Sequence, residues 1–110
     1  YKPGYANINE TIHKVGPHYL QKTTAVGMYP QGVSPYGVAD LSGNVWEWCL
    51  NEYESGKTDP GGDATRVLRG GSWDNSPSNA AAPFRAFNHP DYRFNDLGFR
   101  VVVVGCVPVV

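Results

Sequence analysis

The residues best suited to chemistry lie between positions 74 and 96, and that chemistry is non-covalent recognition. Aromatic side chains in this segment offer large contact areas with few torsions to freeze, and the polar residues between them offer adaptable hydrogen bonds, a mixture typical of antibody paratopes. The alternative is that two or three of the aromatic residues form a core beneath a long loop while the asparagines serve turns. The aromatic residues are Phe84, Phe87, Tyr92 and Phe94, and the polar ones are Asn75, Ser76, Asn88, His89 and Asn95.

Groups suited to catalysis are sparse. The two cysteines, Cys49 and Cys106, are too few for a disulfide scaffold and lack metal-ligand spacing. We expect them to be buried thiols on strands, with a single disulfide between them as the alternative. The three histidines lie too far apart in sequence to form a local metal motif, and no spacing of a nucleophile and a base is visible.

Composition limits the class of protein. A chain of 110 residues with 41% hydrophobic and 17% charged residues indicates one soluble globular domain or part of one. The net charge of -1 lacks the basic footprint of nucleic-acid-binding proteins, so we expect no nucleic-acid partner. No apolar run approaches the roughly 20 residues that cross a bilayer, so we expect no membrane partner.

Glycine and proline divide the chain into short pieces, with 13 and 9 copies respectively. No stretch of ten or more positions has apolar residues at helical spacing, so helix should be scarce beyond a turn or two near residues 9–13. Residues 1–36 are expected to be mostly loop, and residues 74–96 show almost no regular pattern.

Strands are expected in three places. Residues 45–49 alternate, with Trp46 and Trp48 on one face, and residues 66–69 form a short apolar stretch. Residues 99–104 are an almost continuous apolar run, which is typical of a central strand covered on both faces.

Three strings in these elements resemble the formylglycine-generating-enzyme (sulfatase-modifying factor) family, a branch of the C-type-lectin-like fold. They are Tyr36–Trp48, Arg66–Trp73 and Gly98–Arg100, and the resemblance extends from about residue 5 to residue 104. It implies a loop-rich α+β fold with short antiparallel strands and little helix. The family's longer N-terminal half has no counterpart, so residues 1–110 are expected to be a single domain that is either the C-terminal part of a larger one or a reduced version.

The resemblance also implies calcium as a structural cofactor. One site would use the Asp40 and Glu47 carboxylates with the Gly43 and Val45 carbonyls, all hard oxygen donors. The alternative is that Asp40 caps a turn and Glu47 forms an ion pair with an arginine such as Arg100. A second site would use Asn7 with the carbonyls of Ile8 and Leu20, although His18 stands where the family has an aspartate.

Enzymes of this family use two copper-binding cysteines just after the string that ends at Trp73. The corresponding positions here are Asn75 and Ala80, and neither supplies a thiolate. We therefore expect no copper and no formylglycine-generating activity.

A narrower resemblance concerns the region from Arg66 to Arg100, which is similar to the variable region of proteins diversified by retroelements. In such proteins asparagine codons of a template are copied with errors at adenines, a process that cannot produce Lys, Gln, Glu, Met or Trp. None of these five occupies the matching positions. The implied ligand-binding residues are Asp74, Asn75, Ser76, Phe84, Ala86, Phe87, Asn88, His89, Tyr92, Phe94, Asn95 and Asp96.

The sequence thus favours a non-enzymatic binding domain whose segment 74–96 recognises a macromolecular ligand, most simply a protein. One alternative is an oxidising enzyme of the sulfatase-modifying type, inactive for lack of the cysteines. Another is a structural part of a larger polypeptide, with the 74–96 surface buried against the rest of it.

Overall fold

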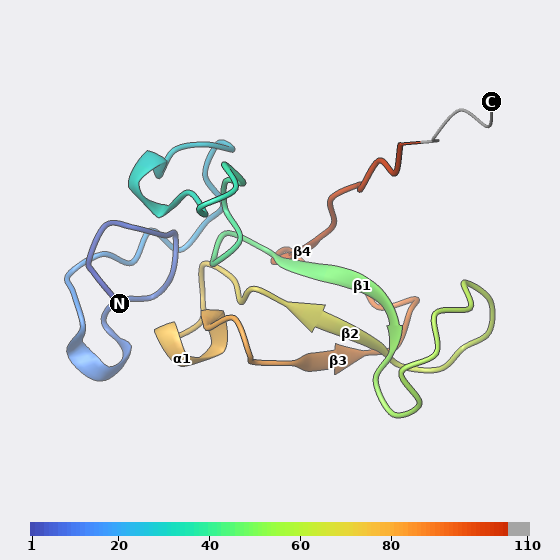
Figure 1. The fold of residues 1–110 in the computed structure, drawn as a ribbon. Helices are drawn as coiled ribbons and strands as arrows, with labels where there is room; N and C mark the ends of the chain where they lie inside the picture. Colours follow the sequence, from blue (N-terminus) through green and yellow to red (C-terminus); the bar gives the residue numbers. More distant parts are fainter. Residues whose placement is uncertain (106–110) are drawn as a thin grey trace.

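The computed structural model describes residues 1–105, whose centre is a four-stranded sheet in the order β3-β2-β1-β4 (Figure 1). Strand β1 spans Trp46–Glu52 and β2 spans Arg66–Arg69. Strand β3 spans Ala86–Asn88, and β4 is only Leu97–Gly98. The expected strands at 45–49 and 66–69 are confirmed, the first extending three residues further.

The core of the sheet follows from the apolar residues of β1 and β2. These strands pair antiparallel, with Trp48 opposite Leu68, and β2 pairs antiparallel with β3. Trp46, Val67 and Leu68 are buried, as the alternation of β1 and the apolar centre of β2 predict. Strand β4 runs parallel to β1, so the expectation of antiparallel strands holds for two of the three pairs.

Helix is scarce, as expected. The α-helix α1 is one turn, Pro77–Ala80, and begins with a proline, whose missing N–H is not needed in a first turn. Two 3₁₀ turns lie at Ile12–Lys14 and Pro30–Gly32. No helix in the described part of the chain is long and apolar enough to cross a membrane.

The N-terminal loop is fastened to the start of β1 through Asn7 and the turn before the strand. The amide of Asn44 donates to the Asn7 carbonyl at 2.8 Å, and the Asn7 side chain donates to the Asn44 side chain at 3.2 Å. Gly43 has a φ of +80°, and a Cβ there would lie 2.4 Å from the Asn7 carbonyl oxygen. Only glycine permits this approach, which brings Ile8 into a small cluster with Ala6 and Ala80.

The prediction of a central strand at 99–104 is wrong. Pairing with β1 ends at Gly98, and no described segment pairs with β4 on its other side. The following residues leave the sheet, as the red trace in Figure 1 shows, and their side chains are exposed, with Phe99 at 75% and Val103 at 89%. An apolar run indicates that burial is favourable, but burial also requires covering elements, and residues 1–105 provide none at this edge.

Candidate functional site

The twelve residues expected to bind ligand lie mostly at the surface. Seven are exposed, including Phe87 at 54% and Phe94 at 61%, so these aromatic residues do not form a core beneath a loop. Four are half-buried: Asn75, Ala86, Asn88 and Asp96. The exposed residues, which we call the contact surface, are Asp74, Phe84, Phe87, His89, Tyr92, Phe94 and Asn95.

Strand β3 explains why Phe87 faces outward. It is the outer strand next to β2, with Phe87 opposite the buried Val67. Ala86 and Asn88 are half-buried on either side of the exposed Phe87. Phe87 shares a face with Val67 but lies on the outer strand, which no described strand covers on its other side. The Phe87 ring lies 4.5 Å from the ring of Tyr53, just after β1, which restricts its orientation.

The sheet and the segment after β3 enclose a groove of about 290 Å³. Its floor includes Trp46 and Leu68, which belong to the scaffold, together with Leu97 of β4. Two aromatic rings on its rim, Tyr92 and Phe94, stack at 6.1 Å between centroids. Six of the twelve expected residues line the groove: Ala86, Phe87, Asn88, Tyr92, Phe94 and Asp96.

Several of the twelve residues also make hydrogen bonds within the chain. The Asn75 side chain accepts from the backbone N–H and the hydroxyl of Ser72, and Asp96 accepts from the same hydroxyl at 2.9 Å. Ser76 is only 4% exposed and bonds with Ser78. The surface placement expected for Ser76 is wrong, because its hydroxyl is used at the start of α1.

The two positions where the enzymes have cysteines are structural here. Ala80 is buried, and its carbonyl accepts from the Ser42 hydroxyl at 2.9 Å. Gly71 approaches Ala80 so closely that a Cβ on this glycine would lie 3.0 Å from the Ala80 Cα. Asn75 holds the Ser72 turn as described above, so both residues support the backbone of the segment.

Cys49 is half-buried in β1, as expected of a thiol on a strand. Burial raises the pKa of its thiol and so disfavours the nucleophilic thiolate. Cys106 lies outside the described residues, so its expected burial and the alternative disulfide stay predictions.

The Asp40–Glu47 region has the ion pair that was the alternative to calcium. Nε of Arg100 donates to the Glu47 carboxylate at 2.6 Å, and the same guanidinium donates to the Ala39 and Asp40 carbonyls at 2.9 Å. The bond to Glu47 raises the pKa of Arg100. The Asp40 carboxylate accepts from the Gly27 amide at 2.8 Å, as a turn cap does. A calcium ion here would have to share Glu47 with a guanidinium, so these donors fit the ion poorly.

The donors around Asn7 fit calcium better. The Asn7 Oδ1 atom is buried and has no hydrogen-bond partner among residues 1–105, while the Nδ2 atom donates to the Lys22 carbonyl at 2.9 Å. Such an oxygen is costly to leave unpaired, and an amide oxygen is a calcium ligand. His18 pairs with Glu10, at 2.7 Å from Nδ1 to Oε1. No group of three or more His, Cys, Asp or Glu residues within 1–105 is arranged to hold a metal, so this site would depend on amide and carbonyl oxygens.

Sequence reasoning missed some residues that shape the site. Tyr53 was given no role from the sequence, yet its ring lies against that of Phe87. Arg66 and Arg93 line a second cavity beside the groove. Two features of the sequence could have indicated them. Tyr53 is an aromatic residue just after an alternating strand, and Arg93 is a lone arginine between Tyr92 and Phe94.

Comparisons with known proteins agree with this arrangement. Residues 3–104 match the family described as "Sulfatase-modifying factor enzyme 1-like domain". "Inactive C-alpha-formylglycine-generating enzyme 2" of Mus musculus is 41% identical over 83 residues, covering 67% of this chain and 25% of the mouse protein. "Hercynine oxygenase" of Mycobacterium tuberculosis is 32% identical over 112 residues, covering 92% of this chain and 26% of that protein.

A solved structure, "Treponema denticola variable protein 1", superposes with a TM-score of 0.65 at 32% identity, covering 87% of this chain and 34% of the other. The chain therefore spans about a quarter to a third of the length of these three relatives. Those relatives include a protein named as inactive, one named as an oxygenase and one named as a variable protein. The chain belongs to the sulfatase-modifying factor enzyme 1-like domain family, and its fold is the α+β, C-type-lectin-like fold of the formylglycine-generating type.

Proposed function

We propose that this chain is a binding module without catalytic activity, and that its contact surface recognises a protein ligand through residues that vary between versions of the protein. The observation that carries the proposal is the exposure of four aromatic side chains in one segment of the chain: Phe84, Phe87, Tyr92 and Phe94. Exposed aromatic clusters of this kind are typical of protein interfaces.

The arrangement supports variation of the contact surface. The β1–β2 pairing and the turn around Asn44 hold the fold through hydrogen bonds that involve none of the seven exposed residues. Phe84 and Phe87 contact this scaffold through their rings, whose centroids lie 6.0 Å from that of Trp46 and 4.5 Å from that of Tyr53. Scaffold residues form the floor of the groove and variable residues form its rim. A substitution on the rim can therefore change which ligand binds without changing the structure of the sheet. The similarity to a solved variable protein supports the same reading.

The proposal is tested with a displayed library of the full chain in which only the seven contact-surface residues are randomised. Selection against a model protein, hen lysozyme, should yield binders whose melting temperatures stay within a few degrees of the parent. The matched control is a second library that randomises Asn75, Ser76 and Asp96, which should yield mostly unfolded chains. Widespread unfolding in the first library, or binders that arise only from the second, would overturn the proposal.

The alternative, an oxidising enzyme, is favoured by the similarity to a protein named as an oxygenase. It requires thiolates or another metal-binding set at the positions of Asn75 and Ala80, where this chain has an amide and a methyl group. A copper(I) titration of the full chain distinguishes the two, because the binding module should take up no copper at micromolar concentrations while an enzyme of this type should.

A further inference from the structure

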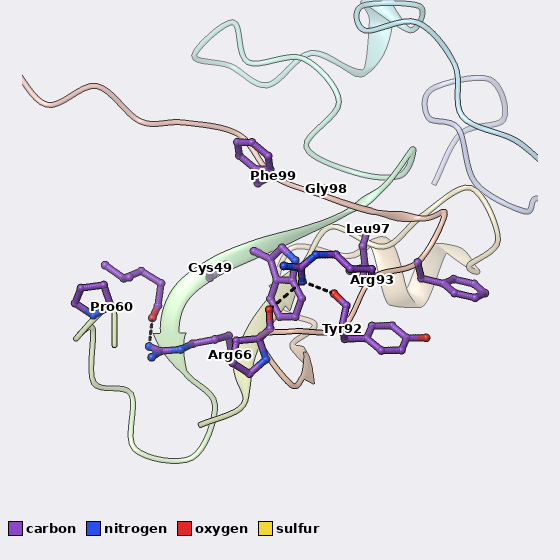
Figure 2. A pocket seen from close by; sticks show the side chains of 12 residues that line it. Cys49, Pro60, Arg66, Tyr92, Arg93, Leu97, Gly98 and Phe99 are labelled. Carbon is purple, nitrogen blue, oxygen red and sulfur yellow. Dashed lines mark hydrogen bonds between the residues drawn. The ribbon is translucent and has the colours of Figure 1, made fainter. Parts of the chain in front are cut away.

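A cavity of about 510 Å³ adjoins the groove, between β1 and the segment that joins β3 to β4 (Figure 2). Most of its lining is apolar, with Trp48 and Leu50 from β1 and Phe99 after β4. It shares Tyr92 and Phe94 with the groove, so a ligand on the contact surface reaches both hollows.

Two arginines lie among these apolar side chains. Arg66 of β2 is only 6% exposed, and its guanidinium donates to the Leu50 carbonyl at 2.8 Å and the Gly61 carbonyl at 2.6 Å. Arg93 is exposed and donates to the carbonyls of Pro90 and Tyr92 at 3.0 and 2.9 Å. Figure 2 labels both arginines and shows as dashed lines the bond from Arg66 to Leu50 and the two bonds from Arg93.

The charge of these two guanidinium groups is not neutralised within residues 1–105. The ion pairs found there join His18 to Glu10, His89 to Asp91 and Arg100 to Glu47, and none includes a cavity arginine. Carbonyl oxygens orient a guanidinium but carry no net charge. A charged group as buried as Arg66 is usually paired with an opposite charge. An anion that entered this apolar cavity would therefore be attracted by the two guanidinium groups.

We infer that this cavity receives an apolar side chain of the protein ligand together with a neighbouring carboxylate, an inference that rests on the function proposed above. The apolar group lies against Trp48, Leu50 and Phe99. The carboxylate accepts from the exposed Arg93. The bonds to the Pro90 and Tyr92 carbonyls both come from its Nη1 atom, which leaves the N–H groups of Nε and Nη2 to donate to a ligand. Arg66 adds a fixed positive charge behind it.

The test uses the full chain and 8-anilinonaphthalene-1-sulfonate, a probe with an aromatic body and one negative charge. Fluorescence titration should show one site, and Arg93→Gln should weaken binding about fivefold, as expected for loss of an exposed charge-assisted contact. Arg85→Gln is the matched control, because Arg85 is also exposed and donates to a backbone carbonyl, that of Tyr53 at 3.0 Å, but does not line the cavity. Its affinity should equal that of the unmodified chain.

N-phenyl-1-naphthylamine, which has the same rings without the sulfonate, should bind more weakly than the charged probe and should not distinguish Arg93→Gln from the parent. Leu50→Asn should weaken both probes. Equal binding of the two probes, or no effect of Arg93→Gln, would overturn the inference and indicate an apolar surface that another polypeptide segment covers. An unchanged affinity in Leu50→Asn would place the probe elsewhere and also overturn it. Neither readout needs the protein ligand, so this test can fail while the lysozyme selection succeeds.

Discussion

Glu10 is a carboxylate with no exposed surface inside the N-terminal loop. Its oxygens accept from the Tyr1 hydroxyl at 2.6 Å, the Gly4 amide at 2.7 Å and both the amide and the ring of His18. Burial by itself raises the pKa of Glu10, but the hydrogen bonds from Tyr1, Gly4 and His18 outweigh it and hold the pKa below its ordinary value of 4.5. One buried anion therefore organises a loop that has almost no regular structure.

We predict that Glu10→Gln lowers the free energy of unfolding by about 2 kcal/mol, because an amide cannot satisfy all of these donors. Since the folded pKa lies below the unfolded one, the stabilisation by Glu10 is complete above pH 4.5 and is lost as the pH falls through the lower, folded value. Urea denaturation at pH 7 and below pH 4 measures both effects. The exposed Glu54→Gln serves as control, and an equal loss in the two variants would contradict the prediction.

We predict that calcium binds at Asn7 rather than at Glu47. Asn7 Oδ1 is buried without a partner, whereas Glu47 already pairs with Arg100. Calcium on the order of 1 mM should therefore raise the melting temperature of the parent chain and of Glu47→Gln, and should leave that of Asn7→Ala unchanged. Differential scanning fluorimetry with and without a chelator measures these increments. An increment lost in Glu47→Gln and kept in Asn7→Ala would place the ion at the other site.

At the scale of the element, β2 and β3 separate stability from recognition. Leu68 of β2 is 4% exposed and pairs with Trp48 on one side and Ala86 on the other. Phe87 of β3 is 54% exposed and contacts the Tyr53 ring. Two residues on neighbouring strands thus have opposite environments, because β2 lies between two strands while β3 is at the edge of the sheet.

Leu68→Ala should therefore cost about 2–5 kcal/mol of stability, the usual range for emptying a core position. Phe87→Ala should cost less than about 1 kcal/mol, since its side chain gives up a partly exposed contact. Chemical denaturation of both variants checks the contrast. A larger cost for Phe87→Ala than for Leu68→Ala would mean that β3 is part of the structural core.

The sequence was most informative where structure depends on local pattern. The alternation around Trp46 and the apolar stretch of Arg66–Arg69 predicted β1 and β2, because burial on one face leaves a repeat in the sequence. Strand β3 was missed, because a strand of three residues is formed by its pairing with β2 rather than by its own pattern. The internal bond of Asp96 was missed because its partner Ser72 is 24 residues away and leaves no local pattern. The burial of Ser76 was missed although its partner Ser78 is only two residues away.

At the scale of the whole molecule, residues 1–105 form a thin, extended body around a small core. The principal extents are 51 × 36 × 22 Å and the radius of gyration is 15.4 Å, against about 13 Å for a compact domain of this length. Within the described residues, only six hydrophobic ones are buried: Ala6, Ile8, Trp46, Val67, Leu68 and Ala80. Apolar groups that a thicker domain would cover therefore stay at the surface, most of all after β4.

We predict that the isolated chain self-associates through the apolar residues that follow β4. Val101, Val102, Val103 and Val104 are 78–89% exposed and continuous with Phe99, and exposed apolar patches of this kind promote association. Sedimentation velocity up to about 100 µM should show concentration-dependent oligomers, which the double variant Val102→Asn, Val104→Asn should abolish. Val26→Asn is the matched control, because Val26 is 84% exposed but lies in the N-terminal loop. A parent chain that stays monomeric, or association that Val26→Asn abolishes equally, would show that this edge does not drive contact between copies.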